Sequence, residues 1–224
     1  MSREYHSSVR LDVAPLVPQV ARLLDVGGGT GTMARHLKSI GRAKEIGVID
    51  AVVDQHSDGL DFAANVDLND AEAVARFLAE NGPFDAILFL DVLEHLVDPW
   101  SIVDVFIGHL TETGVMIASI PNVRHRSVVV DLIARNRWRY ADAGVLDRTH
   151  LRFFVKETAV ELMQRPGMAI EQVAASPIGS RRDKLINLLT FGLLRSFFTL
   201  QYFVVARRDT NGGEGKGTDR RQRP

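Results

Sequence analysis

The chain has no cysteine, which excludes disulfide bonds and thiolate metal sites. Neither sign of charge dominates, because 27 basic and 28 acidic side chains give a formal net charge of −1, which leaves no global basic surface for nucleic acid. The residues after Met1 lack the apolar run of a signal peptide, and no apolar stretch reaches the roughly twenty residues that cross a bilayer. We therefore expect a cytoplasmic protein without a transmembrane segment.

Apolar residues make up 46% of the 224-residue chain, enough for one α/β domain with a sizeable core. Strand patterns alternate with helical patterns, which predicts a mostly parallel sheet with helices on both faces. The expected strands are 22–26, 45–49, 63–66, 84–90, 115–120, 169–174 and 199–206, and the expected helices are 32–39, 71–80, 100–110 and 157–164. The chain then divides into an N-terminal cap (1–21), a domain (22–206) with insertions at 121–154 and 176–198, and a disordered Gly- and Arg-rich tail (207–224).

A glycine-rich turn follows the first expected strand. Leu23 to Gly31 reads Leu-Leu-Asp-Val-Gly-Gly-Gly-Thr-Gly, and a helical pattern begins at Thr32. Glycines let the backbone approach a ligand, and the helix start beyond them offers N–H groups to an anionic group. The spacing fits neither the dinucleotide fingerprint nor a Walker loop. The turn is therefore expected to bind another small molecule with an anionic end.

Acidic residues follow the next strands at the same expected edge of the sheet. Asp50 ends the second strand about twenty residues beyond the turn, where a carboxylate can accept both ribose hydroxyls of a nucleoside. Asp54 competes more weakly for this role. The apolar strand 84–90 leads into Asp91-Val-Leu-Glu-His95, which places acids and an imidazole at its carboxyl end.

The glycine turn and the Asp91–Leu96 string, in this order and spacing, resemble two motifs of class I S-adenosylmethionine-dependent methyltransferases. The resemblance implies a Rossmann-like sheet of seven strands with an antiparallel last strand, and S-adenosylmethionine as the cofactor. It further implies that Asp67 accepts a hydrogen bond from the adenine amine while Leu68 packs on the ring. The expected cofactor-binding residues are Asp25, Gly27, Gly29, Gly31, Asp50, Asp67, Leu68 and Asp91.

A third string, Leu146-Asp-Arg-Thr-His-Leu-Arg-Phe-Phe154, resembles a segment of a bacterial subgroup whose members often lie near sugar, polysaccharide or secondary-metabolite genes. His150 and His95 are the candidate general bases. The alternative for His150 is a structural bond to Asp147. Asn122 is expected to position the acceptor, although an Asn after Pro also suits a turn.

Glu94 is expected to face solvent or to form a salt bridge. The sequence shows no compact cluster of metal ligands that would demand a cation.

The reaction expected from these motifs is O-methylation of a small polar acceptor such as a saccharide or secondary metabolite. Basic residues interleaved with aromatics at 124–140 suit a phosphate-bearing sugar or RNA, and the near-neutral charge disfavours RNA. An RNA methyltransferase and a non-catalytic assembly module remain the alternatives. The apolar stretch 185–198 is expected to form a buried or homodimer-forming helix, with an interfacial helix on a lipid surface as the alternative.

Overall fold

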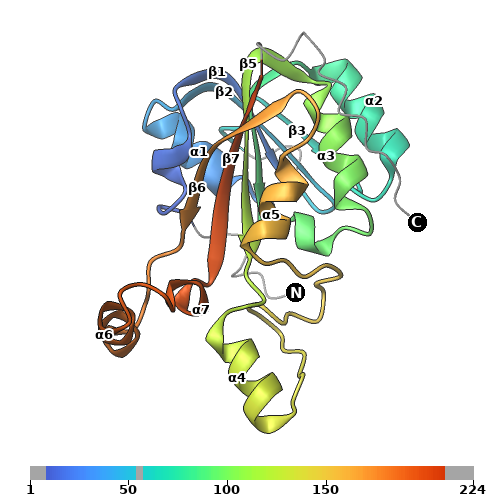
Figure 1. Cartoon of the computed structure of the whole chain (residues 1–224). Helices are drawn as coiled ribbons and strands as arrows, with labels where there is room; N and C mark the ends of the chain where they lie inside the picture. Colours follow the sequence, from blue (N-terminus) through green and yellow to red (C-terminus); the bar gives the residue numbers. More distant parts are fainter. Residues whose placement is uncertain (1–8, 54–57, 210–224) are drawn as a thin grey trace, which may run out of the picture.

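The computed structural model describes residues 9–53 and 58–209, and within these residues seven strands form one sheet in the order β3-β2-β1-β4-β5-β7-β6 (Figure 1). The strands are β1 (Val20–Val26), β2 (Ala43–Asp50), β3 (Phe62–Asn65), β4 (Phe84–Leu90), β5 (Leu110–Pro121), β6 (Met168–Ala175) and β7 (Gln201–Arg208). The pairs from β3 to β5 are parallel, and β7 runs antiparallel to both β5 and β6. This arrangement confirms the predicted Rossmann-like α/β fold with an antiparallel last strand.

Each face of the sheet is covered by its own apolar core. Helix α1 (Thr32–Ser39) and the short 3-10 helix η2 (Ala14–Leu16) cover one face, and α2 (Ala71–Asn81), α3 (Pro99–Ile107) and α5 (Lys156–Met163) cover the other (Figure 1). Neighbouring residues of a strand point to opposite faces, so Leu23 packs in the first core and Leu24 in the second. Burial on both faces explains the continuous apolar runs in the sequence.

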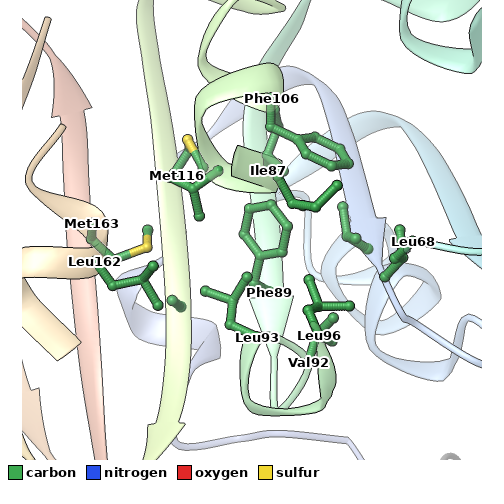
Figure 2. Close-up of a cluster of buried hydrophobic side chains, with 14 of the residues drawn as sticks. Leu68, Ile87, Phe89, Val92, Leu93, Leu96, Phe106, Met116, Leu162 and Met163 are labelled. Carbon is green, nitrogen blue, oxygen red and sulfur yellow. The ribbon is translucent and has the colours of Figure 1, made fainter. Parts of the chain in front are cut away.

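The segment after β4 is pinned to the second core by its apolar residues. Val92, Leu93 and Leu96 point into the cluster around Phe89 and Phe106, as Figure 2 shows. These three side chains fix the 3-10 helix η3 (Leu93–His95) at the carboxyl end of β4. The polar residues interleaved with them are consequently held in defined positions.

Several boundaries differ from those predicted. Strand β5 begins at Leu110, before the predicted start at 115, because Leu110 pairs with Phe84 across an irregularity in the ladder. Strand β1 begins at Val20, inside the predicted cap, and β7 reaches Arg208, inside the predicted tail. Residues 1–8 of the cap and 210–224 of the tail lie outside the described residues.

The insertions form helices outside the sheet layers. The first contains α4 (Arg126–Arg135), and the second contains α6 (Arg181–Leu189) and α7 (Arg195–Phe198). Figure 1 shows α4 and α6 projecting beyond the strands at the same end of the molecule.

The expectation of a single buried helix at 185–198 is wrong in this chain. The stretch is broken between α6 and α7, where Phe191 and Gly192 have positive φ, and several of its large apolar side chains are exposed. Within residues 9–53 and 58–209, no helix combines the length and apolarity that crossing a membrane requires.

Candidate functional site

The glycine turn between β1 and α1 adopts a backbone that requires glycine. Gly27, Gly29 and Gly31 have φ of 68°, 53° and 75°, a region that L side chains rarely adopt. A Cβ on Gly27 would lie 2.5 Å from Cγ2 of Val92, so the turn packs directly against the segment after β4. The first two motifs of the sequence therefore meet at one edge of the sheet.

Replacing Gly27 by alanine tests this contact. We expect Gly27→Ala to lower the free energy of unfolding by about 2–5 kcal/mol, because it adds the left-handed strain of about 1–2 kcal/mol to overpacking of about 1–3 kcal/mol against the stiff Val92 side chain. Gly167→Ala is the matched control, since Gly167 has φ of 77° and nothing within 4 Å of an added Cβ. Urea unfolding of both variants checks the difference, and equal losses would contradict the role of Val92.

Asp50 supports the glycine turn from the end of β2. Its Oδ2 accepts a hydrogen bond from the Gly29 N–H at 3.0 Å, and its Oδ1 accepts one from the Val52 N–H at 2.9 Å. Each carboxylate oxygen can accept a further hydrogen bond. The residue predicted to bind ribose hydroxyls thus contacts the turn and keeps acceptor capacity for a ligand.

Asp25 lies beneath the turn with only 1% of its surface exposed. Burial, reinforced by the charge of Asp50, raises the pKa of Asp25 to about 7. Its Oδ2 has no hydrogen-bond partner among the described residues. A buried acceptor without a partner suits a ligand that brings a positively charged or N–H group to this position.

Asp67 and Leu68 follow β3 at the same edge. Asp67 is exposed, and its Oδ1 accepts a hydrogen bond from the Asn69 N–H at 2.9 Å. Leu68 is 8% exposed and belongs to the core shared with Val92 and Leu96. The Asp67 carboxylate therefore faces solvent, while the neighbouring Leu68 side chain packs in the core.

Asp91 sits at the tip of β4 in a left-handed conformation with φ of 59°. Its Oδ1 accepts hydrogen bonds from Ser119 Oγ at 3.0 Å and from Gln201 Nε2 at 2.6 Å, and its Oδ2 pairs with Arg10. Burial raises the pKa of Asp91, and the Arg10 guanidinium opposes this rise. This carboxylate ties the ends of β4, β5 and β7 to the chain that precedes β1.

His95 and His150 come from different segments and meet edge to face, with ring centroids 4.7 Å apart. His150 Nδ1 lies 3.0 Å from the Val145 carbonyl oxygen, and His95 Nδ1 lies 3.2 Å from that of Thr149. A carbonyl oxygen only accepts, so Nδ1 is the protonated nitrogen in the neutral form of each ring and Nε2 is the nitrogen with the lone pair. The alternative bond from the His150 ring to the Asp147 carboxylate does not form, since Asp147 accepts from Thr149 instead.

Glu94 is buried beside these rings, with 1% of its surface exposed. The expectation that it faces solvent is wrong, because the apolar neighbours Leu93 and Leu96 draw η3 into the core. Its Oε1 lies 3.9 Å from His150 Nε2, and neither carboxylate oxygen has a hydrogen-bond partner among the described residues. Burial, followed by the charge of Asp91, raises the pKa of Glu94 well above its usual range.

The main chain of Glu94 joins the two segments of this cluster. Its carbonyl oxygen accepts hydrogen bonds from the N–H groups of Leu151 at 2.8 Å and Arg152 at 3.0 Å. Glu94, His95 and His150 offer ligand atoms within 4.8 Å of one another, close enough to share one divalent cation. Such a cluster is not evident in the sequence, since His150 belongs to a distant stretch of the chain.

Aromatic rings flank the histidine pair. Phe153 lies 6.4 Å from the His150 ring, 5.5 Å from Trp138 and 6.4 Å from Tyr140, measured between ring centroids. Trp138 and Tyr140 are exposed, so these rings form an accessible aromatic surface next to the histidines. Such a surface can pack on a planar or ring-shaped acceptor.

The side chain of Asn122 forms hydrogen bonds within the fold. It is 1% exposed, and its Nδ2 donates hydrogen bonds of 2.8 Å to the carbonyl oxygens of Ser196 and Thr199. Its Oδ1 accepts from the Arg124 N–H at 3.1 Å. With both amide donors in use, Asn122 holds the second insertion against the end of β5 and has no donor left for an acceptor molecule.

Comparison with protein families relates these features to known proteins. A family model described as a methyltransferase domain matches residues 2–173. The chain is 28% identical over 196 residues to a ubiquinone biosynthesis O-methyltransferase of Cereibacter sphaeroides, covering 82% of this chain and 77% of the relative. A protein of the same name from Xylella fastidiosa is 36% identical over 116 residues, which cover 47% of this chain and 44% of the relative.

Solved structures share the fold. A SAM-dependent methyltransferase from Archaeoglobus fulgidus superposes with a TM-score of 0.59 at 18% identity, covering 92% of this chain and 95% of that chain. The N-methyltransferase NodS from Bradyrhizobium japonicum, crystallised with S-adenosyl-L-homocysteine, gives a TM-score of 0.54 at 15% identity, covering 92% of this chain and 86% of that one. At such identities the likeness establishes the fold.

Proposed function

Because the chain belongs to the methyltransferase domain family, we propose that it transfers the methyl group of S-adenosylmethionine to a hydroxyl oxygen on a ring-shaped small molecule. The observation that carries the proposal is the cluster of His95, His150 and Glu94, two of which come just after Val92, the residue that packs against the glycine turn. S-adenosylmethionine is the cofactor of this reaction. It supplies a methyl group that is already activated by the positively charged sulfonium sulfur.

The residues at the sheet edge fit this cofactor. The glycine turn, with positive φ at Gly27, Gly29 and Gly31, lets the main chain approach a ligand without side chains in the way, and Asp50 keeps acceptor capacity for ribose hydroxyls. The partnerless buried oxygen of Asp25 suits a cationic ligand, whose approach would favour the ionised carboxylate. We assign cofactor binding to these residues together with Asp67 and Leu68.

We assign proton removal from the acceptor hydroxyl to His150. Its Nδ1 is held by the Val145 carbonyl, so the ring orientation is fixed and the Nε2 lone pair is available. Glu94, whose Oε1 lies 3.9 Å from Nε2, would be drawn toward its ionised form as the imidazolium forms, because a positive charge at this distance favours the carboxylate. His95 occupies the same cluster and is the second candidate for the base.

The acceptor class follows from the surroundings of His150. The aromatic surface of Trp138, Tyr140 and Phe153 favours an acceptor that presents a flat ring, and the two relatives described above are named O-methyltransferases. We therefore propose a phenolic hydroxyl as the methylated group. The saccharide expected from the sequence is the competing acceptor, since aromatic rings also pack on sugars.

Transfer of tritium from methyl-labelled S-adenosylmethionine tests the proposal. We expect label to enter a catechol at least about tenfold faster than a methyl glucoside, because only the flat ring stacks fully on the aromatic surface. Trp138→Ala should reduce this preference, and Trp100→Ala is the control, since Trp100 packs on Phe154 instead. Faster labelling of the glucoside or of RNA would overturn the acceptor class, and transfer to none of them despite cofactor binding would support a non-catalytic module.

A further inference from the structure

The second insertion forms a projecting lobe, residues 176–198, which contains α6 and α7 and is referred to below as the α6–α7 lobe. Its surface is apolar where a surface is ordinarily polar. Phe191 is 95% exposed and Leu193 is 82% exposed, and they continue an apolar stripe made by Leu185, Leu188 and Leu189 of α6, which are 56%, 71% and 69% exposed. Contiguous exposure of this kind marks an interaction surface.

The lobe carries positive charge next to this apolar surface. Arg181, Arg182 and Lys184 are exposed in the first turns of α6, and Arg195 is exposed at the start of α7. The one acid of the lobe, Asp183, is buried, and its Oδ2 accepts a hydrogen bond from Arg126 Nε at 3.0 Å. The charge that the lobe presents outward is therefore positive.

Specific contacts anchor the base of the lobe, while the apolar residues at its tip are exposed. Asn122 donates to the Ser196 carbonyl, and Phe197 lies under the Arg124 guanidinium, 4.5 Å from ring centroid to Cζ. Phe198 is buried. The Ser180 hydroxyl caps α6 by accepting from the Asp183 N–H at 3.1 Å. These polar and apolar contacts hold the base of the lobe in a defined position, so the exposed tip is held in place as well.

The lobe lies at the functional end of the molecule. It is attached through Asn122 to the carboxyl end of β5, the same sheet edge that carries the glycine turn and Glu94. Figure 1 shows α6 projecting beyond the strands at this end. A hollow of about 630 Å³ at the base of the lobe is lined by Lys156, Arg195 and Tyr202, which adds further positive charge.

We propose that the α6–α7 lobe docks on an anionic membrane surface, with the tip around Phe191 and Leu193 inserted among the lipid headgroups and the basic side chains on anionic lipid. Apolar residues flanked by Arg and Lys are the composition of segments that lie in the membrane interface. The charge complementarity favours a bilayer over a second copy of the chain, since two copies would bring the same cations together. This proposal is independent of the acceptor class proposed above.

Vesicle flotation of the full chain tests the proposal. The protein is expected to float with vesicles of phosphatidylcholine and phosphatidylglycerol at a ratio of about 3:1, and to remain unbound with phosphatidylcholine alone. Raising the salt concentration should weaken the binding. Loss of selectivity for the anionic vesicles, or no flotation with either, would overturn the proposal.

Matched variants separate the two parts of the surface. Phe191→Ser with Leu193→Ser should weaken vesicle binding at least about tenfold, because it removes the inserted side chains. The control is Ile40→Ser, since Ile40 is 48% exposed but lies at the far end of α1, away from the functional edge. Binding of S-adenosylhomocysteine by the variants, measured by calorimetry, verifies that they are folded.

A second pair of matched variants tests the contribution of the basic side chains of the lobe. Arg181→Gln with Arg182→Gln should weaken binding by about tenfold or more, whereas Lys44→Gln with Arg76→Gln, an equal loss of exposed charge elsewhere, should not. Light scattering of the wild type reports the oligomeric state. A dimer that dissociates on Phe191→Ser with Leu193→Ser, without vesicle binding by the wild type, would assign the surface to a second copy and overturn the membrane proposal.

Discussion

Replacement of His150 by glutamine is expected to lower kcat for methyl transfer by about 10²–10⁴-fold, the range that a positioned general base contributes. The affinity for S-adenosylhomocysteine should change less than about threefold, since the cofactor-binding residues lie on the glycine turn and after β2 and β3. Glutamine retains a donor for the Val145 carbonyl oxygen but has no basic nitrogen. Transfer from labelled S-adenosylmethionine and calorimetry with S-adenosylhomocysteine measure the two quantities.

Further variants identify which member of the cluster takes the proton. His95→Gln should lower kcat less than His150→Gln. Glu94→Gln should both lower kcat and shift its pH profile, because it removes the buried titratable group 3.9 Å from His150 Nε2. His36→Gln, in the last turn of α1, is the control for a histidine outside the cluster.

Two outcomes would contradict the assignment of the base. Unchanged kcat in both His150→Gln and His95→Gln would place the base elsewhere. The second outcome is that a chelator abolishes the activity of the wild type and a divalent cation restores it. The loss in His150→Gln would then be a loss of cation ligation, since Glu94, His95 and His150 could also share a cation.

Replacement of Asp50 by alanine is expected to weaken binding of S-adenosylhomocysteine by about 10²-fold or more. Hydrogen bonds to a charged acceptor contribute about 1.5–3 kcal/mol each, and the variant would lose those to the ribose hydroxyls. It also removes the acceptor of the Gly29 N–H, so the turn loses a support at 3.0 Å. Calorimetric titration of wild type and variant measures the ratio of dissociation constants.

A second substitution separates these two losses. Asp50→Asn keeps one carbonyl oxygen for the Gly29 N–H but removes the charge, so it should bind more tightly than Asp50→Ala and more weakly than the wild type. Asp142→Ala is the control, because Asp142 is an exposed acid of the first insertion. Affinity of Asp50→Ala within about threefold of the wild type would contradict the ribose assignment, and absence of binding to the wild type would contradict cofactor use as proposed.

The succession of strands along the chain and the sheet edge to which we assign the cofactor could be predicted from the sequence, because both depend on local patterns. Continuous apolar runs such as Ile87 to Leu90 are typical of strands buried on both faces. Gly27, Gly29 and Gly31 are needed because the tight turn requires positive φ, a local property of the backbone, and all three glycines have positive φ in the structure. Boundaries were less predictable, since Leu110 joins β5 through pairing with a strand 26 residues earlier, at Phe84.

Only the tertiary structure brings Glu94 beside His150, because burial of Glu94 depends on how deeply Leu93 and Leu96 sink into a core supplied by other elements. Tertiary packing likewise decides that Asn122 is used by the fold and that the apolar residues around Phe191 stay exposed. A sequence of this kind determines which faces are apolar and where the backbone must turn, since these are properties of neighbouring residues. It does not by itself determine which charged group loses its water or which apolar face lacks a partner, since these depend on segments that only folding brings together.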